Sequence, residues 1–485
     1  MERVAEVDVL KVAIGLLAYL VLPPVLATLA ARNRSFHRGL LATMMFMTAL
    51  PVSVITLTAY NLDGYRGHVR GFEFCTVDIV ALGLLGSVML REPKRLRLAV
   101  APAVLYLLMC LGDMVGLVNA VSPFLGWAAV FKYSKAVLPL MAACVAIENE
   151  DDLRWLWWAM AVGLVAMLVV GLKDRYVHGM WRISAMFEHS NSMAMWAYML
   201  SVTLLGTVLV DRGRMAFVLT SLLAVAGGGA LVVLSLARAS LVAYAVGVSG
   251  ILLITLVRRP SVRAATVAAL LLVATVGMGA LAADSIMNRV NAAKDQDGIE
   301  NYRSALNRQA ALMLHDHPLG IGWNNYGVVN SRPHGERYSV IMEDWERTIG
   351  HHIYEDNFRA NPLTESYYWL QLAENGYLGF CGHLLFFVVS LRWCWRATWR
   401  HHRTVAGGFA LACTLTLSLL YLHSTIERVL VQTKNLDAWL ILIGACVAIL
   451  NFPSADNRPG ESSGVARVQR NIRQADGIPS ALDRK

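Results

Sequence analysis

The feature that most restricts the fold of this chain is a series of apolar runs, each long enough to cross a lipid bilayer. A transmembrane helix needs about 20 mostly apolar residues. Of the 485 residues, 56% are hydrophobic and only 16% are charged, so we expect an all-α, polytopic transmembrane helical bundle with twelve or thirteen spans. The predicted spans are 8–29, 39–60, 73–90, 97–118, 127–147, 154–172, 190–210, 215–235, 239–257, 264–283, 374–391, 405–423 and 437–451.

The net charge of +9 comes largely from short basic connectors between these runs, at 31–38, 91–97 and 392–403. Such connectors are typical of cytoplasmic loops under the positive-inside rule, so the charge does not indicate a nucleic-acid partner. Applied along the chain, the rule predicts an external amino terminus and a cytoplasmic tail. None of the seven cysteines lies in a CxxC pair or in the long polar loop, and neither a disulfide framework nor a metal site is expected.

The apolar runs divide the chain into four regions. Residues 1–283 hold ten predicted spans, and residues 369–453 hold the last three. Between them, residues 284–368 form one long polar loop, which charge places in the periplasm. Residues 454–485 are rich in Pro, Gly, Ser and Arg, and we expect them to be disordered.

The long loop far exceeds the usual connection length, which favours a functional role. Within it, Asn301 to Leu314 has helical periodicity, and Pro318 is expected to end that helix. Gly320 and Gly322 then predict a tight turn with a closely approached backbone. The loop is therefore predicted to be partly helical and to carry much of the chemistry.

Four arginines in the predicted external connectors are candidate phosphate ligands: Arg182, Arg238, Arg303 and Arg308. A guanidinium keeps its charge and can bind phosphate through two parallel hydrogen bonds. Several of them at one membrane face suit a lipid-linked diphosphate. Arg238 lies in a very short turn between two spans, where the alternative is that it reaches toward lipid headgroups. Arg303 and Arg308 should point to different faces of the loop helix.

The loop also supplies candidate proton acceptors. They are His315, His317, His334, His351, His352 and Glu365. His315 and His317 flank Asp316 where the helix ends, so a capping role is an equal possibility. Glu365 lies where the loop re-enters the membrane, and its alternative role is to cap the closing helix. No regular set of third and fourth ligands accompanies the histidines, so metal binding is not expected.

Several stretches resemble sequence patterns of the bacterial O-antigen ligase/polymerase superfamily. Arg182 to Asn191 (RISAMFEHSN), which includes His189, resembles R-x-x-G-x-F-x-H-x-N with Ala185 in place of glycine. Ser235-Leu-Ala-Arg238-Ala is similar to an S-R-[GA] element with a different spacing. Arg303 and the following HDHPLGIGWNNY resemble R-x-x-x-W-x(9–10)-hPlxGxGxxxf, with Asn307 in place of tryptophan.

The closing segment TESYYWLQLAENGYLGF is similar to the family's last-loop pattern, a hydrophobic helix with L-x-E-x-G-x-x-G. The family's ligases usually carry a His-Asn pair shortly before that helix. Here Asn361 stands in that region without a histidine. This departure points to Glu365, or to His352 folded back, as the activating base.

The resemblance implies a glycosyltransferase of the bacterial inner membrane. It would transfer a glycan from undecaprenyl diphosphate to a sugar hydroxyl at the periplasmic face, without a metal or other cofactor. A ligase delivers the glycan to lipid A-core, and a polymerase delivers it to another lipid-linked repeat. Both remain open.

A transporter or flippase of a lipid-linked saccharide is the alternative from another class. It requires polar groups near the bilayer midplane and some repeat symmetry. The predicted spans contain few charges, chiefly Asp78 and Asp113, and each of these can pair locally. A membrane sensor or scaffold accounts for the spans but not for the external arginines.

Overall fold

The computed structural model describes most of the chain outside the long loop and the tail. The described residues are 2–50, 55–57, 69, 71–210, 215–258, 260, 265–267, 269–270, 273, 287, 297–330, 337–338, 363–402 and 404–453. The predicted span at 264–283, most of the second half of the loop and the tail after 453 therefore lie largely or wholly outside them.

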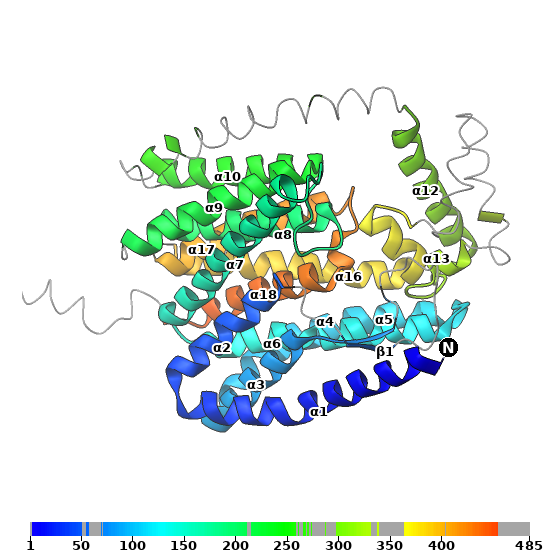
Figure 1. Ribbon diagram of the computed structural model, residues 1–485, viewed down its shortest axis with the longest axis horizontal. Coiled ribbons are helices and arrows are strands. Elements are labelled where there is room, and N and C mark those ends of the chain that lie inside the picture. Colours follow the sequence, from blue (N-terminus) through cyan, green and yellow to red (C-terminus); the bar gives the residue numbers. More distant parts are fainter. Residues whose placement is uncertain are drawn as a thin grey trace, which may run out of the picture.

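The described chain is a bundle of long helices with one small sheet (Figure 1). Its α-helices are α1 (Glu2–Arg32), α2 (Arg34–Met47), α3 (Thr76–Arg91), α4 (Arg97–Met114), α5 (Pro123–Lys135), α6 (Val137–Ala146), α7 (Glu150–Tyr176), α8 (Ser190–Val208), α9 (Met215–Ser235), α10 (Arg238–Arg258), α12 (Asp297–Asp316), α13 (Tyr326–Val329), α16 (Tyr367–Arg400), α17 (Val405–His423) and α18 (Thr433–Leu450). The 3-10 helices are η1 (Pro93–Leu96), η2 (Val115–Asn119) and η4 (Val429–Val431).

The predicted all-α, membrane-spanning class is confirmed. Within the described ranges, nine helices are long and apolar enough to cross a membrane. Large apolar side chains stay exposed on α1, α4, α7 and α10, as expected of surfaces that face lipid rather than water. The protein is a multi-pass membrane protein.

Helices α8 and α18 occupy the centre of the bundle. Every side chain from Ser192 to Val208 in α8 is buried, and so is every one from Asn435 to Ile449 in α18. Because α8 is enclosed by other helices, it tolerates polar residues that a lipid-facing helix would not. Its buried hydroxyl groups at Ser201 and Thr203 each donate to a carbonyl one turn back in the same helix.

The prediction of a continuous span over 39–60 is wrong. Helix α2 ends at Met47, and Ile55–Leu57 forms strand β1, which pairs antiparallel with β2 (Phe72–Phe74). Pro51 follows the end of the helix, and a proline disfavours the helical conformation for the residue before it. The β-branched residues that follow favour a strand.

The helical part of the long loop gathers at one end of the bundle, which we call the loop end. Helix α12 and the single turn α13 lie there, beyond the ends of α5 and α16 (Figure 1). The predicted loop helix is confirmed, and α12 stops at Asp316, two residues before Pro318. Proline has no backbone N–H to donate to the hydrogen bonds of a helix, which explains why α12 ends before Pro318.

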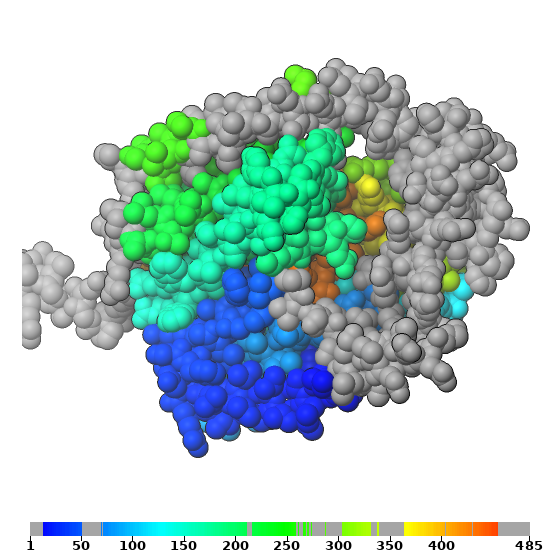
Figure 2. Space-filling model, viewed as in Figure 1, coloured from blue at the N-terminus to red at the C-terminus, as the bar shows by residue number. Residues whose placement is uncertain are grey.

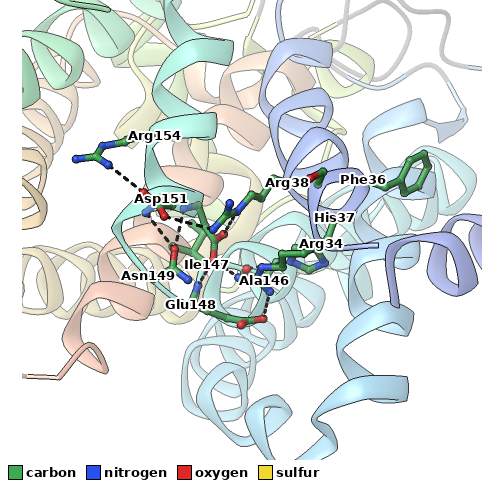
Figure 3. Close-up of polar contacts among 12 residues, drawn as sticks. Arg34, Phe36, His37, Arg38, Ala146, Ile147, Glu148, Asn149, Asp151 and Arg154 are labelled. Carbon is green, nitrogen blue, oxygen red and sulfur yellow. Dashed lines mark hydrogen bonds and ion pairs between the residues drawn. The ribbon is translucent and has the colours of Figure 1, made fainter. Parts of the chain in front are cut away.

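A network of ion pairs joins α2 to α7 at the opposite end (Figure 3). The Asp152 side chain is fully buried and accepts from Arg34, from Nε of Arg38 at 2.9 Å and from its own chain at the Glu148 backbone N–H. Glu148 accepts from Arg34 at 2.5 Å and from Arg91 at 3.1 Å. Although burial opposes ionisation, these arginines lower the pKa of Glu148. The acidic connector before α7, Glu148 to Asp152, is thus neutralised by arginines at the start of α2 and the end of α3.

Candidate active site

At the loop end, five polar side chains from four distant segments form what we call the arginine–carboxylate cluster. Its members are Arg182, Asn191, Arg303, Glu365 and Glu427. They come from the start of α8, from α12, from the residues before α16 and from the turn after α17. In the space-filling view, the teal-green surface of the α7–α8 region borders orange and yellow surface from the last third of the chain (Figure 2).

Arg303 lies between the two carboxylates. Its Nε contacts Glu365, and its Nη2 is 3.3 Å from Oε1 of Glu427. The Arg303 and Glu365 side chains are 39% and 35% exposed, whereas that of Glu427 is only 12% exposed. The Arg303 side chain is therefore partly exposed, while its guanidinium is held by two protein acids.

Arg182 fixes the segment before α8 to the end of α9. Its Nε donates to the Ser235 carbonyl at 2.7 Å, and its Nη2 donates to Asn191. Burial lowers the pKa of Arg182, and the charges of Glu427 and Glu365 oppose that shift. Arg182, Glu365 and Glu427 are therefore close enough to interact electrostatically, and we treat them as one site.

Glu427 is a functional candidate that the sequence did not reveal. Burial raises its pKa, and the charge of Glu365 raises it further, against the hydrogen bond from Asn191 and the charge of Arg303. The carboxyl group is thus a better proton acceptor than an exposed glutamate would be. The available signal was an adjacent acid and base, Glu427 and Arg428, in an otherwise mostly apolar connector.

Arg428 supports the site through the backbone. Its Nη1 donates to the carbonyls of Leu363 at 2.7 Å and Thr364 at 3.0 Å. The Thr364 hydroxyl in turn donates to Asn307 of α12 at 2.8 Å. These contacts hold the segment that carries Glu365 against both α12 and the turn after α17.

Glu365 does not cap the closing helix. Ser366 occupies the N-cap position of α16, and its hydroxyl accepts from the Trp369 backbone N–H. The Glu365 carboxylate is instead committed to Arg303. The structure therefore favours a role for Glu365 in the cluster over the capping alternative.

The conformation of Ala185 explains why a glycine suits this position. Its φ is +46°, a left-handed conformation that costs an L-residue energy and glycine almost none. Leu236, in the turn between α9 and α10, also has a positive φ of +55°. Both turns lie beside Arg182, so strained backbone surrounds the cluster.

The two glycines of the loop turn have a structural role. Gly320 and Gly322 have φ of +93° and +98°, and an added Cβ at Gly320 would lie 2.3 Å from the Glu374 carbonyl. The turn is bonded to α16 where that helix breaks at Gly376: Ile321 N–H donates to Ala373 and Gly322 N–H donates to Glu374, both at 3.0 Å. The predicted close backbone approach is confirmed.

Two predicted arginines lie outside the cluster. Arg238 is the exposed first residue of α10, and Arg308 is exposed on α12, facing away from Arg303. Neither has a polar partner in the part of the chain that the structure describes. His189 is an exposed N-cap residue of α8, and its side chain makes no capping hydrogen bond. His352 and Asn361 lie outside the described residues.

Asp78 and Asp113, the two aspartates noted in the predicted spans, each pair with a side chain of another helix. Asp78 accepts from Nζ of Lys135 at 2.6 Å, and Asp113 lies 2.9 Å from Nε2 of His383. Among the described residues, no group of three or more His, Cys, Asp or Glu side chains could hold a metal ion.

Residues 220–354 match a protein-family model described as O-antigen ligase. This match supports the resemblance of the chain to the O-antigen ligase/polymerase superfamily. The O-antigen ligase match begins within α9 and includes α10, α12 and the glycine turn, and thus Arg303 of the cluster. The predicted resemblance is confirmed. No curated protein matches the chain.

Proposed function

We propose that this O-antigen ligase/polymerase-type membrane enzyme transfers a glycan from undecaprenyl diphosphate to a sugar hydroxyl at the periplasmic face of the bacterial inner membrane. The observation that carries the proposal is the position of Arg303 between Glu365 and Glu427. A partly exposed arginine next to two acids supplies both an anion site and a proton acceptor.

The diphosphate competes with Glu365 for Arg303. With no donor bound, the partly exposed Glu365 neutralises the guanidinium. A diphosphate carries more charge and can accept two parallel hydrogen bonds from arginine, so it displaces the carboxylate. Arg182 and Arg303 then hold the diphosphate and stabilise the charge that develops as it leaves.

A carboxylate of the cluster then acts as the base. The acceptor hydroxyl oxygen forms a bond to the anomeric carbon while the bond from that carbon to the phosphate oxygen breaks. The bonding electrons leave with undecaprenyl diphosphate, and the hydroxyl proton passes to a carboxylate. We assign this role to Glu365 or Glu427, because both border Arg303. His352 remains the alternative base proposed from the sequence.

The role assignment is tested with purified protein in vesicles that contain a lipid-linked glycan donor and an acceptor. Arg303→Ala and Glu365→Gln are each expected to reduce transfer at least about 100-fold, the usual size of a lost charge-stabilising or acid–base group. Arg337→Ala is the control, because it removes an equal charge from the same loop at an exposed pair with Asp316. Full transfer by both cluster variants contradicts the assignment.

A deletion strain distinguishes ligase from polymerase. When its surface polysaccharide is separated on a gel, loss of all long glycan from lipid A-core, with polymer accumulating on the carrier, indicates a ligase. A single repeat unit that remains attached to lipid A-core indicates a polymerase.

A further inference from the structure

Three buried polar side chains form a hydrogen-bonded chain between α4 and α16. The carboxylate of Asp113 lies 3.1 Å and 2.9 Å, through its two oxygens, from Nε2 of His383. The other ring nitrogen of His383, Nδ1, is 2.9 Å from the hydroxyl of Tyr367. Asp113 and His383 are fully buried and Tyr367 is 3% exposed. Ionisable groups inside a membrane protein are costly to bury, which favours a functional role.

This chain spans the break in α16. At Gly376 the backbone has φ +65° and ψ −168°, so the segment before it and the segment after it are two separate helical pieces. Tyr367 and Asn375 belong to the first piece, and His383 belongs to the second. Asp113 of α4 binds His383 of the second piece, and His383 binds Tyr367 of the first. The three side chains therefore join the two pieces to each other and to α4.

Packing at the break leaves little room for another arrangement. The Tyr367 ring stacks on Phe387 of the second piece, with centroids 6.0 Å apart. A Cβ added to Gly379 would lie 2.6 Å from Oδ1 of Asp113 and 2.5 Å from Cβ of Asn375. The missing side chain at Gly379 therefore leaves room for Asp113 and Asn375 next to the second piece.

The chain ends next to the arginine–carboxylate cluster. Tyr367 follows Glu365 by two residues, and its backbone N–H donates to the Ser424 carbonyl at 3.0 Å. Ser424 in turn precedes Glu427 by three residues. The placement of Tyr367 thus sets the segments that carry both acids of the cluster.

We propose that Asp113 and His383 are positioning residues of the transfer reaction: through Tyr367 they hold Glu365 and Glu427 opposite Arg303. The inference rests on the proposed function of the cluster. It assigns a positioning role to the ionisable pair Asp113 and His383, which lies outside the cluster itself.

The test uses Tyr367→Phe, which removes the hydroxyl and leaves the stacked ring. Hydrogen–deuterium exchange of the intact protein in nanodiscs reports the backbone of residues 363–376, and vesicle assays with a lipid-linked donor report kcat and KM. We expect exchange to accelerate about fivefold to tenfold in this segment, as for one lost hydrogen bond. We also expect kcat to fall about tenfold while KM for the donor is unchanged.

Tyr106→Phe is the matched control, because it removes a hydroxyl just as buried, on α4, from a ring that contacts Phe386. It should leave both exchange at 363–376 and kcat unchanged. His383→Gln, which keeps an N–H for Asp113, should retain more kcat than His383→Leu.

Two results overturn the inference. Unchanged exchange in Tyr367→Phe shows that the hydroxyl does not hold the segment. Faster exchange with an unchanged kcat shows that the held segment does not position the acids. If the wild-type protein transfers no glycan, the proposed function fails, and the exchange result still decides whether the three side chains form a clamp.

Discussion

Glu427 shows how much of this site depends on one buried acid. Its carboxyl group touches Arg303 of α12 and Asn191 of α8, although the three residues are far apart in the sequence. Burial raises the pKa of this carboxyl group, and the charge of the nearby Glu365 raises that pKa further. The ionisation of Glu427 therefore costs more free energy in the folded chain than in the unfolded chain.

The raised pKa of Glu427 makes the stability of the protein depend on pH. Because the pKa of Glu427 is raised in the folded chain, its stabilising effect is complete below the ordinary glutamate pKa of about 4.3 and is lost as the pH rises through the raised value. Glu427→Gln carries no titrating proton. We therefore expect the variant to lose less stability than the wild type between about pH 4 and about pH 7.

Thermal unfolding of the purified protein in detergent, followed across that pH range, measures the difference. Glu92→Gln, at an exposed position in the connector before α4, is the control and should follow the wild type. A Glu427→Gln curve parallel to that of the wild type would show that the buried carboxyl group does not titrate differently in the folded chain.

The sequence led to part of this cluster and not to the rest. Arg182, Asn191, Arg303 and Glu365 stand out because they are polar residues in motifs next to apolar spans. Glu427 does not, because its importance arises from tertiary packing of the α17–α18 turn against α12. Arg238 satisfied the same sequence criterion as Arg182, yet it is exposed at the start of α10.

Among the helices, the joint between α2 and α7 shows how two neighbouring acids differ in effect. Asp152 is fully buried beneath Arg34 and Arg38, whereas Asp151 is 57% exposed and pairs with Arg38 and Arg154 at the surface. Removing one partner of a buried ion pair leaves the other charge buried and unpaired, which is strongly destabilising. An exposed ion pair contributes little to stability.

We expect Asp152→Ala to reduce the free energy of unfolding by about 3 kcal/mol, at the low end for buried pairs because both arginines are partly exposed. Asp151→Ala should cost less than about 1 kcal/mol. Denaturant or thermal unfolding in detergent compares the two. Equal losses in the two variants would show that the joint does not depend on the buried carboxylate.

Hydropathy predicted helices well and their ends less well. The span predicted at 374–391 covers only the middle of α16, which runs from Tyr367 to Arg400. The start of this helix near Glu365 was expected from the sequence. Hydropathy also merged α2 with the strand at Ile55–Leu57, because an apolar run has the same composition in either conformation.

For the molecule as a whole, connector charge predicts which end faces the periplasm. We expect Leu319→Cys, at the loop end, to react with a membrane-impermeant maleimide in intact cells, since Leu319 is 45% exposed. Glu92→Cys, in the basic connector before α4, should react only after the membrane is opened. The parent is a Cys381→Ser variant, because Cys381 is the exposed cysteine among the seven. The reverse labelling pattern would invert the topology.

The burial of α8 has a consequence for how the protein is made. This central helix is not one of the nine helices that are long and apolar enough to cross a membrane by composition alone. We therefore expect its insertion from the translocon into lipid to be less favourable than that of the other helices. The ribosome delivers α8 before α9, α10 and α17, three of the helices that enclose it. We therefore expect α8 to be stably inserted only after α17 has been synthesised. A chain truncated before α17 would expose α8 to lipid and to quality-control proteases.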